Sequence, residues 1–324
     1  MKTIKIGLLG LGNIGTGTYK TLEMNRSEIE STLNAKVEIV KILERDTERD
    51  RGITVPKEKF TSDPDEIFQD PEIDIVIELL GGIEPATTFM LSALKNGKHV
   101  VTANKAALAA NYHELINAAK ENNVILRFEA SVGGGIPILG TLTGPLRANK
   151  FEVVMGILNG TTNYILTMMT KEGLDYETAL KDAQEQGFAE ADPTADVEGI
   201  DAANKLTILM ALMFDKYVAP KDIPTTGITE ITKEKIEEAR SNGCKIKLIA
   251  HAWRDENDEI KYEVRPMYIS ATHPLANINK EFNAVFVKGN AVDDVMFYGK
   301  GAGPLPTGSA VLGDVIDISM MILK

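Results

Sequence analysis

The first third of the chain alternates short apolar runs with helical segments, and this alternation limits the fold more than any other feature. Apolar runs rich in β-branched residues occupy residues 4–10, 36–43, 73–82, 98–103 and 124–130. A helical segment over 13–32 and further ones after residues 82 and 103 lie between them. Strands that are apolar throughout are buried on both faces, and connecting helices supply that cover. We therefore expect a doubly wound parallel α/β sheet.

The pattern changes after residue 130, where the glycine-rich stretch SVGGGIPIL interrupts it. Several later segments alternate apolar and polar residues, as half-exposed strands do. In KYEVRPMYI, Tyr262, Val264 and Pro266 belong to one face, whereas Glu263 and Arg265 belong to the other. A chain of 324 residues suits about two domains. We expect a dinucleotide-binding domain over 1–133, a second α+β domain for catalysis and dimerisation over 134–304, and a tail helix over 305–324 that returns to the first.

A glycine-rich turn follows the first expected strand and opens the first expected helix. It reads Gly10-x-Gly12-x-x-Gly15. The first glycine permits a tight turn, the second leaves room for a pyrophosphate, and the third lets the helix pack against the sheet. Asn13 and Ile14 lie at the helix N-terminus, which favours anions. In this context the motif predicts a Rossmann-like dinucleotide site; a turn that serves packing alone is the alternative.

The choice between NAD and NADP depends on the end of the second strand, ILERD. An acid there binds the ribose of NAD, whereas an arginine accommodates the 2′-phosphate of NADP. Glu44 and Arg45 are adjacent, and Arg49 and Arg51 follow in a segment that could equally be a solvated charged loop. We favour NADP through Arg45 and keep NAD as the alternative.

Two more strand ends carry residues suited to a ligand, since ligands of open α/β sheets bind at the carboxyl ends of the strands. Gly81 and Gly82 end one apolar run and allow close backbone approach. Thr102 to Lys105 end another, where Lys105 would face the nicotinamide end of a cofactor. A surface lysine at a helix start is the alternative, although the helix dipole disfavours it.

A cluster of carboxylates precedes an apolar helix in GFAEADPTADVEGIDAANK, residues 187–205. Asp192-Pro193 signals a turn, and Asp196 is expected to cap the following helix. Asp201 and Lys205 are four residues apart and share one helical face. A lysine held where that helix enters the core can donate a proton to a carbonyl oxygen. An ordinary helical salt bridge is the alternative.

Composition excludes several classes of protein and partner. The net charge of −12 disfavours nucleic acids and anionic membranes as partners. The single cysteine permits no internal disulfide, which fits a cytoplasmic protein. Glycines interrupt the N-terminal apolar run, so we do not expect a signal peptide. No apolar run approaches the length of a membrane span, and we expect none.

At this point the residues resemble a known family. The spacing from Ala183 through Gly187, Asp192-Pro193 and Asp201 to Lys205 is similar to the signature of homoserine dehydrogenases, and the likeness extends over GLGNIG, GGIEP, TANK, FEASVGGGIPI, GILNGTTNYI and MFYGKGAGPLPTGSAV. The resemblance implies reversible reduction of L-aspartate 4-semialdehyde to L-homoserine with NADPH or NADH, in threonine and methionine biosynthesis. Separately, the amphipathic strands of the second domain could pair across a two-fold axis, and we therefore expect a homodimer. Many bacterial members carry a C-terminal ACT domain; this sequence ends before one, so we expect a short form or a truncated chain without threonine inhibition through such a domain.

The resemblance also implies roles for individual residues. Lys205 would be the general acid/base, Lys105 a second lysine at the reacting oxygen, and Asp201 a residue that orients Lys205 or binds substrate. The remaining substrate residues would be Glu190 for the amino group, Asp196, Asn159, Gly160 and Thr161. Gly187 and Gly303 would approach the cofactor. A monovalent cation, expected to be sodium, would be held by Glu129, Val132, Gly134 and Ile136, mainly through carbonyl oxygens.

Two other functions compete with this interpretation. Aspartate-semialdehyde dehydrogenase acts on the same metabolite but needs a cysteine nucleophile and a histidine, and no motif surrounds Cys244. A non-catalytic nicotinamide sensor would not need Glu190, Asp201, Lys105 and Lys205 together.

Overall fold

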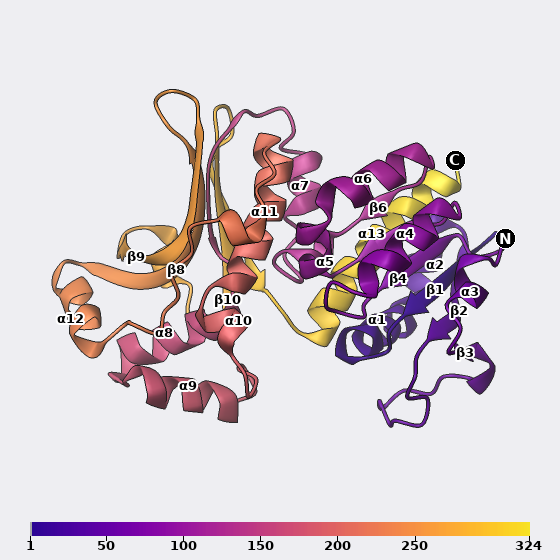
Figure 1. Cartoon of the computed structure of the whole chain (residues 1–324), viewed down its shortest axis with the longest axis horizontal. Coiled ribbons are helices and arrows are strands. Elements are labelled where there is room, and N and C mark those ends of the chain that lie inside the picture. Colours follow the sequence, from indigo (N-terminus) through magenta and orange to yellow (C-terminus); the bar gives the residue numbers. More distant parts are fainter. Residues whose placement is uncertain (1) are drawn as a thin grey trace. The chain divides into compact units, whose positions relative to one another are not determined.

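The computed structural model describes residues 2–324, which form two compact units (Figure 1). Unit 1 comprises the chain up to Gly135 together with Ala302–Lys324. Unit 2 comprises Ile136–Gly301. The C-terminal segment thus belongs to the same unit as the N-terminal strand, although the 166 residues of unit 2 separate the two parts of unit 1 in the sequence.

Unit 1 contains a parallel sheet, which confirms the predicted fold class. The strand order is β3-β2-β1-β4-β5-β6, and every pair is parallel. The chain builds outward from β1 through β2 and β3, then returns to the other side of β1. This reversal creates the switch point at which doubly wound sheets bind ligands. The strands are β1 (Thr3–Leu9), β2 (Lys36–Leu43), β3 (Phe60–Thr61), β4 (Ile75–Glu78), β5 (His99–Thr102) and β6 (Leu126–Arg127).

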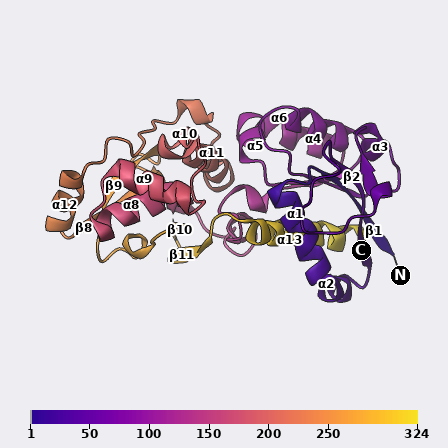
Figure 2. The same cartoon turned by 90° about the horizontal axis from the view of Figure 1, so that it is seen from below.

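Helices cover both faces of this sheet, as Figure 2 shows. One face carries α1 (Asn13–Met24), α2 (Arg26–Leu33) and α13 (Pro304–Ile322). The other carries α3 (Asp65–Phe68), α4 (Ala86–Lys95), α5 (Lys105–Ala110) and α6 (Tyr112–Glu121). The single helix predicted over 13–32 is wrong: Asn25, with φ −116°, separates α1 from α2.

Helix α13 packs closely against α1 because both helices carry glycine at the contact. A Cβ at Gly17 would lie 2.2 Å from the Pro304 oxygen, and a Cβ at Gly308 would lie 2.8 Å from the Thr18 nitrogen. Among the described residues α13 is the one helix long and apolar enough to cross a membrane. Its Val311, Leu312, Val315 and Ile318 instead belong to the core of unit 1, as expected for a core helix.

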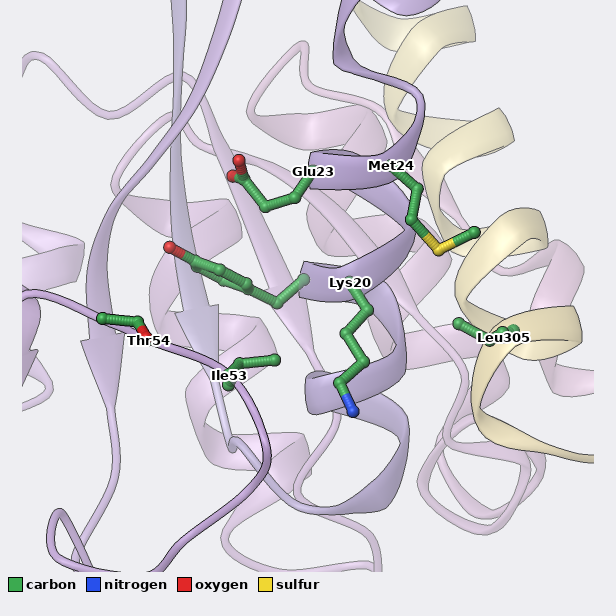
Figure 3. A pocket seen from close by; sticks show the side chains of 7 residues that line it. Lys20, Glu23, Met24, Ile53, Thr54 and Leu305 are labelled. Carbon is green, nitrogen blue, oxygen red and sulfur yellow. The ribbon is translucent and has the colours of Figure 1, made fainter.

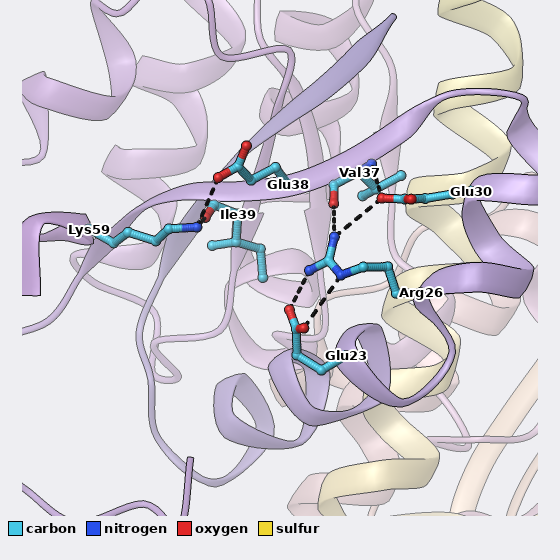
Figure 4. A network of polar contacts seen from close by, with 7 residues as sticks. All are labelled: Glu23, Arg26, Glu30, Val37, Glu38, Ile39 and Lys59. Carbon is cyan, nitrogen blue, oxygen red and sulfur yellow. Dashed lines mark hydrogen bonds and ion pairs between the residues drawn. The ribbon is translucent and has the colours of Figure 1, made fainter. Parts of the chain in front are cut away.

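Ion pairs at the rim of the sheet hold β2 against the helices (Figure 4). Arg26 donates to the Val37 oxygen at 2.6 Å and pairs with Glu30 and Glu23. Lys59 donates to the Ile39 oxygen at 2.8 Å and pairs with Glu38. Exposed pairs of this kind each stabilise a fold by about 0–1 kcal/mol. Their main effect is to orient β2, whose last residues approach the glycine-rich turn.

Unit 2 contains an antiparallel sheet in the order β11-β10-β7-β8-β9. Helices α8 and α11 pack on it. Val264 is fully buried, and Glu263 and Arg265 form an ion pair of 2.9 Å, so β9 separates its apolar and charged side chains there as predicted. The elements are α7 (Leu139–Thr143), β7 (Phe151–Ile157), α8 (Gly160–Glu172), α9 (Tyr176–Glu185), α10 (Thr194–Val197), α11 (Ile200–Phe214), α12 (Lys233–Ser241), β8 (Cys244–Arg254), β9 (Ile260–Ser270), β10 (Phe282–Gly289) and β11 (Asp293–Lys300).

Candidate active site

The glycine-rich turn of unit 1 has the geometry of a phosphate-binding turn. Gly10 has φ +92° and donates its N–H to the Leu43 oxygen at 3.0 Å. A Cβ at Gly12 would meet nothing within 4 Å, which leaves space above the turn, whereas a Cβ at Gly15 would lie 2.2 Å from the Gly10 oxygen. Helix α1 starts at Asn13 with no acidic residue in its first turn. Its free N–H groups and dipole therefore suit a pyrophosphate.

Glu44, at the end of β2, is held by backbone donors and one arginine. Its carboxylate accepts hydrogen bonds from the N–H groups of Leu11 (3.0 Å), Arg45 (2.9 Å) and Asp46 (3.1 Å). Arg51 lies 3.3 Å from the same carboxylate. These hydrogen bonds and this cation outweigh burial and lower the pKa of Glu44. Three backbone donors thus occupy most of the roughly four lone-pair directions of the carboxylate, and Arg51 adds a positive charge beside it.

Arg51 is not part of a solvated loop, and the sequence did not single it out as part of the turn. Its side chain is only 7% exposed, and Nε donates to the Leu11 oxygen at 2.7 Å. Its other nitrogens donate to the carbonyl oxygens of Arg49 and Asp46. Glu44 therefore binds the N–H of Leu11 and Arg51 binds its carbonyl oxygen, and Leu11 lies between the first two glycines of the turn. The Arg45 side chain is exposed.

The ends of β4 and β5 are joined through a carboxylate that the sequence did not single out. Glu78 is fully buried and accepts a hydrogen bond from Thr102 Oγ1 at 2.7 Å. Asn104 caps α5 by accepting from the Ala107 N–H at 3.1 Å and also donates to the Gly82 oxygen at 2.7 Å. Thr102 is itself 0% exposed. The Thr102 hydroxyl thus supports the strand end, and the place of Thr102 in a cofactor site stays a prediction.

Lys105 is the first residue of α5 and comes directly after Asn104 in the sequence. It is partly buried. Gly81 has φ +78°, and a Cβ there would meet nothing within 4 Å. The turn after β4 thus presents bare backbone at the switch-point edge of the sheet, where unit 1 would hold a dinucleotide.

In unit 2, Lys205 and Asp201 lie on one face of α11 at its start. Both are buried, and Lys205 Nζ lies 2.6 Å from Asp201 Oδ2. Nζ also donates to the Leu158 oxygen at 2.6 Å. The spacing of four residues predicted this pair. The contact with Leu158, at the end of β7, depends on packing between segments 47 residues apart.

Asn159 connects this pair to the carboxylate of Asp196. Its Nδ2 donates to Asp201 Oδ2 at 2.9 Å and to Asp196 Oδ1 at 2.6 Å, while its Oδ1 accepts from the Thr162 N–H and caps α8. Thr161 Oγ1 lies 3.1 Å from Asp196 Oδ2 and donates to the Phe188 oxygen at 2.6 Å. The structure thus brings together Asn159, Thr161, Asp196, Asp201 and Lys205 in one polar group.

The expectation that Asp196 caps α11 is wrong. The residue before α11 is Gly199, with φ +82° and no side-chain cap, and Asp196 lies within α10. Asp192 shapes the preceding turn by accepting from the Thr194 N–H and hydroxyl. Only a glycine easily adopts the Gly199 conformation, so the chain turns there, and the Asp196 carboxylate points to Asn159 and Thr161.

Four further predicted residues are placed without a demonstrated ligand role. Glu190 is exposed, and among residues 2–324 no hydrogen bond or ion pair holds its carboxylate. Gly187 follows α9 with φ +76°, and Gly303 precedes α13 with φ +117°. Gly160 starts α8, where a Cβ would lie 2.8 Å from the Glu281 oxygen; packing therefore requires a glycine at this helix N-terminus.

The segment expected to hold a cation is a tight turn. Gly133 and Gly134 have φ values of +73° and +55°. The Glu129 oxygen accepts from the Val132 N–H, and the Ile136 oxygen accepts from the Ile138 N–H. Each carbonyl keeps a second lone pair that a hard cation can use. Among the described residues, no cluster of three His, Cys, Asp or Glu side chains could bind a metal.

The contacts of Cys244, His99 and His273 and one hollow of unit 1 involve none of the predicted site residues. Cys244 Sγ lies 3.5 Å from the Asn242 oxygen, and His99 and His273 each accept a backbone N–H through Nδ1. A hollow of about 390 Å³ on unit 1 (Figure 3) contains none of the predicted site residues, so we assign it no ligand. Its lining residues are Tyr19, Lys20, Glu23, Met24, Ile53, Thr54 and Leu305.

The parallel sheet, the phosphate-binding turn and the buried lysine–carboxylate pair define a dinucleotide-dependent oxidoreductase. The family model described as "Homoserine dehydrogenase" matches residues 137–316, and that described as "Homoserine dehydrogenase, NAD binding domain" matches residues 10–129. The chain belongs to the homoserine dehydrogenase family.

Individual relatives agree over nearly the whole chain. Homoserine dehydrogenase of Bacillus subtilis is 45% identical over 98% of this chain and 73% of its own length. The crystal structure of a homoserine dehydrogenase from Thiobacillus denitrificans has a TM-score of 0.96 at 43% identity and covers 99% of this chain and 74% of its own. A hyperthermophilic archaeal homoserine dehydrogenase in complex with NADPH has a TM-score of 0.83 at 26% identity, covering 98% of both chains.

Proposed function

We propose that this protein interconverts L-aspartate 4-semialdehyde and L-homoserine with a nicotinamide cofactor, in threonine and methionine biosynthesis. The observation that carries the proposal is the buried group of Lys205, Asp201, Asn159 and Asp196 in unit 2. A lysine fixed by two acceptors in a largely dry environment suits proton transfer better than a solvated salt bridge does. Family membership supports the same reaction.

Lys205 acts as the general acid in reduction and as the general base in the reverse direction. When bound, the nicotinamide cofactor supplies or accepts the hydride. Asp201 and the Leu158 oxygen orient Nζ, each at 2.6 Å. The lysine then donates a proton to the substrate oxygen as negative charge develops there, and its positive charge stabilises that oxygen. Lys105, on unit 1, is the second lysine of the proposed reaction.

The rest of the pocket suits a small zwitterion. The exposed carboxylate of Glu190 can accept the substrate ammonium, and Asp196 adds negative charge to the same pocket. The start of α8, at Gly160 and Thr161, has no acidic residue in its first turn. Its backbone N–H groups and dipole therefore favour the substrate carboxylate.

The cofactor preference that we propose is NADP, with NAD as the alternative. The carboxylate of Glu44, which would otherwise bind the ribose diol of NAD, already accepts from three backbone N–H groups and lies beside Arg51. The exposed Arg45 side chain, two residues after β2, is available to a 2′-phosphate. The residues of unit 1 that would hold the dinucleotide are Gly10, Gly12, Asn13, Ile14, Gly15, Arg45, Gly81, Thr102, Lys105 and Gly303, and Gly187 of unit 2 would approach it.

A monovalent cation, a homodimer and a cytoplasmic location complete the proposal. The carbonyl oxygens of Glu129, Val132, Gly134 and Ile136 would hold sodium in the glycine turn. One face of the sheet in unit 2 carries partly exposed apolar side chains, including Met155, Trp253, Phe286 and Met296, which supports pairing with a second copy. Nucleic acids and membranes are not proposed partners, because the net charge is −12.

A spectrophotometric assay of NADPH oxidation with aspartate semialdehyde tests the proposal. Lys205→Ala should lower kcat by about 10²–10⁴-fold, the range for a lost general acid. Lys221→Ala, which removes an exposed lysine of the same unit, is the matched control. Equal kcat in wild type and Lys205→Ala would refute the role of Lys205. An inactive wild type that still binds NADPH would favour a nicotinamide sensor.

A further inference from the structure

Glu78 is a buried carboxylate for which the proposed reaction gives no role. It is the last residue of β4 and is fully buried. Burial raises its pKa, although hydrogen bonds from Thr102, the Leu80 N–H and Asn104 act in the opposite direction. A strand end that only needed to be filled would carry an apolar side chain, as its neighbours Ile75, Val76 and Ile77 do.

The carboxylate of Glu78 links two strand ends and the turns that follow them. Glu78 Oε1 accepts a hydrogen bond from the Leu80 N–H at 2.8 Å and lies 3.5 Å from Asn104 Nδ2. Glu78 Oε2 accepts a hydrogen bond from the Thr102 hydroxyl at 2.7 Å. Thr102 Oγ1 in turn accepts the Asn104 N–H at 2.9 Å. The Asn104 side chain also donates a hydrogen bond from Nδ2 to the Gly82 oxygen at 2.7 Å.

The backbone segments held in this way carry the features that a nicotinamide ring would meet. Both lie at the carboxyl edge of the sheet beside the switch point, where such cofactors bind. One contains Gly81, whose positive φ and open surroundings expose the backbone. The other runs into Lys105 at the start of α5, and Asn104 caps that helix. Since α5 has only six residues, its start depends on these contacts rather than on its own stability.

We propose that Glu78 is a positioning residue for hydride transfer, which holds the turn at Gly81–Gly82 and the start of α5 at Lys105 in their reactive arrangement. This inference rests on the proposed function. Glu78 touches neither substrate nor cofactor; it acts through Thr102 and Asn104.

The test is the near-isosteric variant Glu78→Gln. The Leu80 N–H, the Asn104 NH₂ and the Thr102 hydroxyl all donate to the carboxylate. A carboxamide NH₂ must either face the N–H donors of Leu80 and Asn104 or turn the Thr102 hydroxyl into an acceptor, so the present arrangement of hydrogen bonds is not kept. We expect amides of residues 79–84 and 103–110 to exchange hydrogen faster in the ligand-free variant. We also expect kcat to fall about tenfold, which corresponds to one such bond. The primary deuterium isotope effect with 4-deuterated cofactor should rise, because hydride transfer becomes slower relative to the other steps.

A second variant and a control keep the inference refutable. Asn104→Ser retains a side chain that can cap α5, but this shorter side chain cannot reach Gly82 and Glu78. It should therefore speed hydrogen exchange and raise the isotope effect as Glu78→Gln does. This variant still tests the inference if Glu78→Gln does not fold. Glu72→Gln, at an exposed carboxylate of unit 1, should match wild type. An unchanged isotope effect in both Glu78→Gln and Asn104→Ser would overturn the positioning role, whatever the kcat of the two variants. A smaller folded fraction would lower kcat but would leave the isotope effect unchanged. An inactive wild type would instead refute the proposed function.

Discussion

Lys247 should make the stability of the protein depend on pH in a way that one substitution removes. This residue of β8 is only 2% exposed, and its Nζ donates to Asn163 Oδ1 at 2.9 Å and to the Ile278 oxygen. Its hydrogen-bond partners are neutral acceptors. Burial, and after it the positive charges of Lys245 and Lys171, lower the pKa of Lys247 from 10.5 to about 7.

The magnitude follows from the two pKa values. Between about pH 7 and 10.5 the unfolded chain binds a proton at this lysine that the folded chain does not, so the free energy of unfolding rises with pH. Below pH 7 both states bind the proton, and the full cost remains. Integration gives a cost of about 4 kcal/mol at pH 7 and about 2 kcal/mol at pH 9. Wild type should therefore gain about 2 kcal/mol between these pH values from Lys247 alone.

The variant Lys247→Met keeps the side-chain length and removes the titrating group. It leaves two acceptors without their donor, a cost of about 1 kcal/mol each that does not vary with pH. Urea unfolding followed by circular dichroism at several pH values between 7 and 9 measures the difference. Lys288→Met, at a half-exposed lysine of β10, removes the same charge without burial and is the control.

The result depends on slopes and not on absolute stabilities. The wild-type free energy of unfolding should rise relative to Lys247→Met by about 2 kcal/mol across this range. The pH curves of the free energy of unfolding for wild type and Lys288→Met should be nearly parallel. Parallel pH curves for wild type and Lys247→Met would refute the reasoning, because they would show that Lys247 binds its proton equally in the folded and unfolded chains.

Two further predictions concern the cofactor and the cation. Arg45→Ala should raise KM for NADPH about 10- to 150-fold, since a charge-assisted hydrogen bond is worth about 1.5–3 kcal/mol, and should leave KM for NADH unchanged. Lys57→Ala, which removes an exposed lysine, is the control. Equal effects on both cofactors would contradict a 2′-phosphate contact. Replacing sodium in the assay buffer by tetramethylammonium at constant ionic strength should reduce activity, and returning sodium should restore it. Full activity in tetramethylammonium would argue against a cation at the glycine turn.

Elements with a repeating pattern could be predicted closely from the sequence. The runs at 4–10 and 36–43 correspond to β1 and β2 within a residue at each end, because a continuous apolar run must be buried. The run at 73–82 was extended too far: β4 ends at Glu78, and Gly81 and Gly82 adopt positive φ, which a strand cannot use. The run at 124–130 was also too long, since residues from Glu129 form a 3₁₀ turn after β6. The two-residue strand β3 is too short to show a pattern.

The site residues also divide into those that local spacing predicts and those that depend on tertiary packing. The pairing of Lys205 with Asp201 could be predicted because helical geometry places residues four apart on one face. The partners Leu158 and Asn159 lie 47 and 42 residues away from them, and nothing in local spacing indicates such contacts. Glu78 and Arg51 were missed for the same reason: one appeared to be a strand residue and the other a loop charge.

The periodic structure, the glycine-rich turn and the pair on α11 follow from the sequence alone, because each depends on residues a few positions apart. The direction in which individual polar side chains point depends instead on tertiary packing. This packing brought Asp196 to Asn159 and Thr161 instead of to the start of α11, enclosed Arg51 around Leu11, and buried Glu78 between two strand ends. Buried polar groups must find hydrogen-bond partners, and the partners within reach are known only when distant segments have packed.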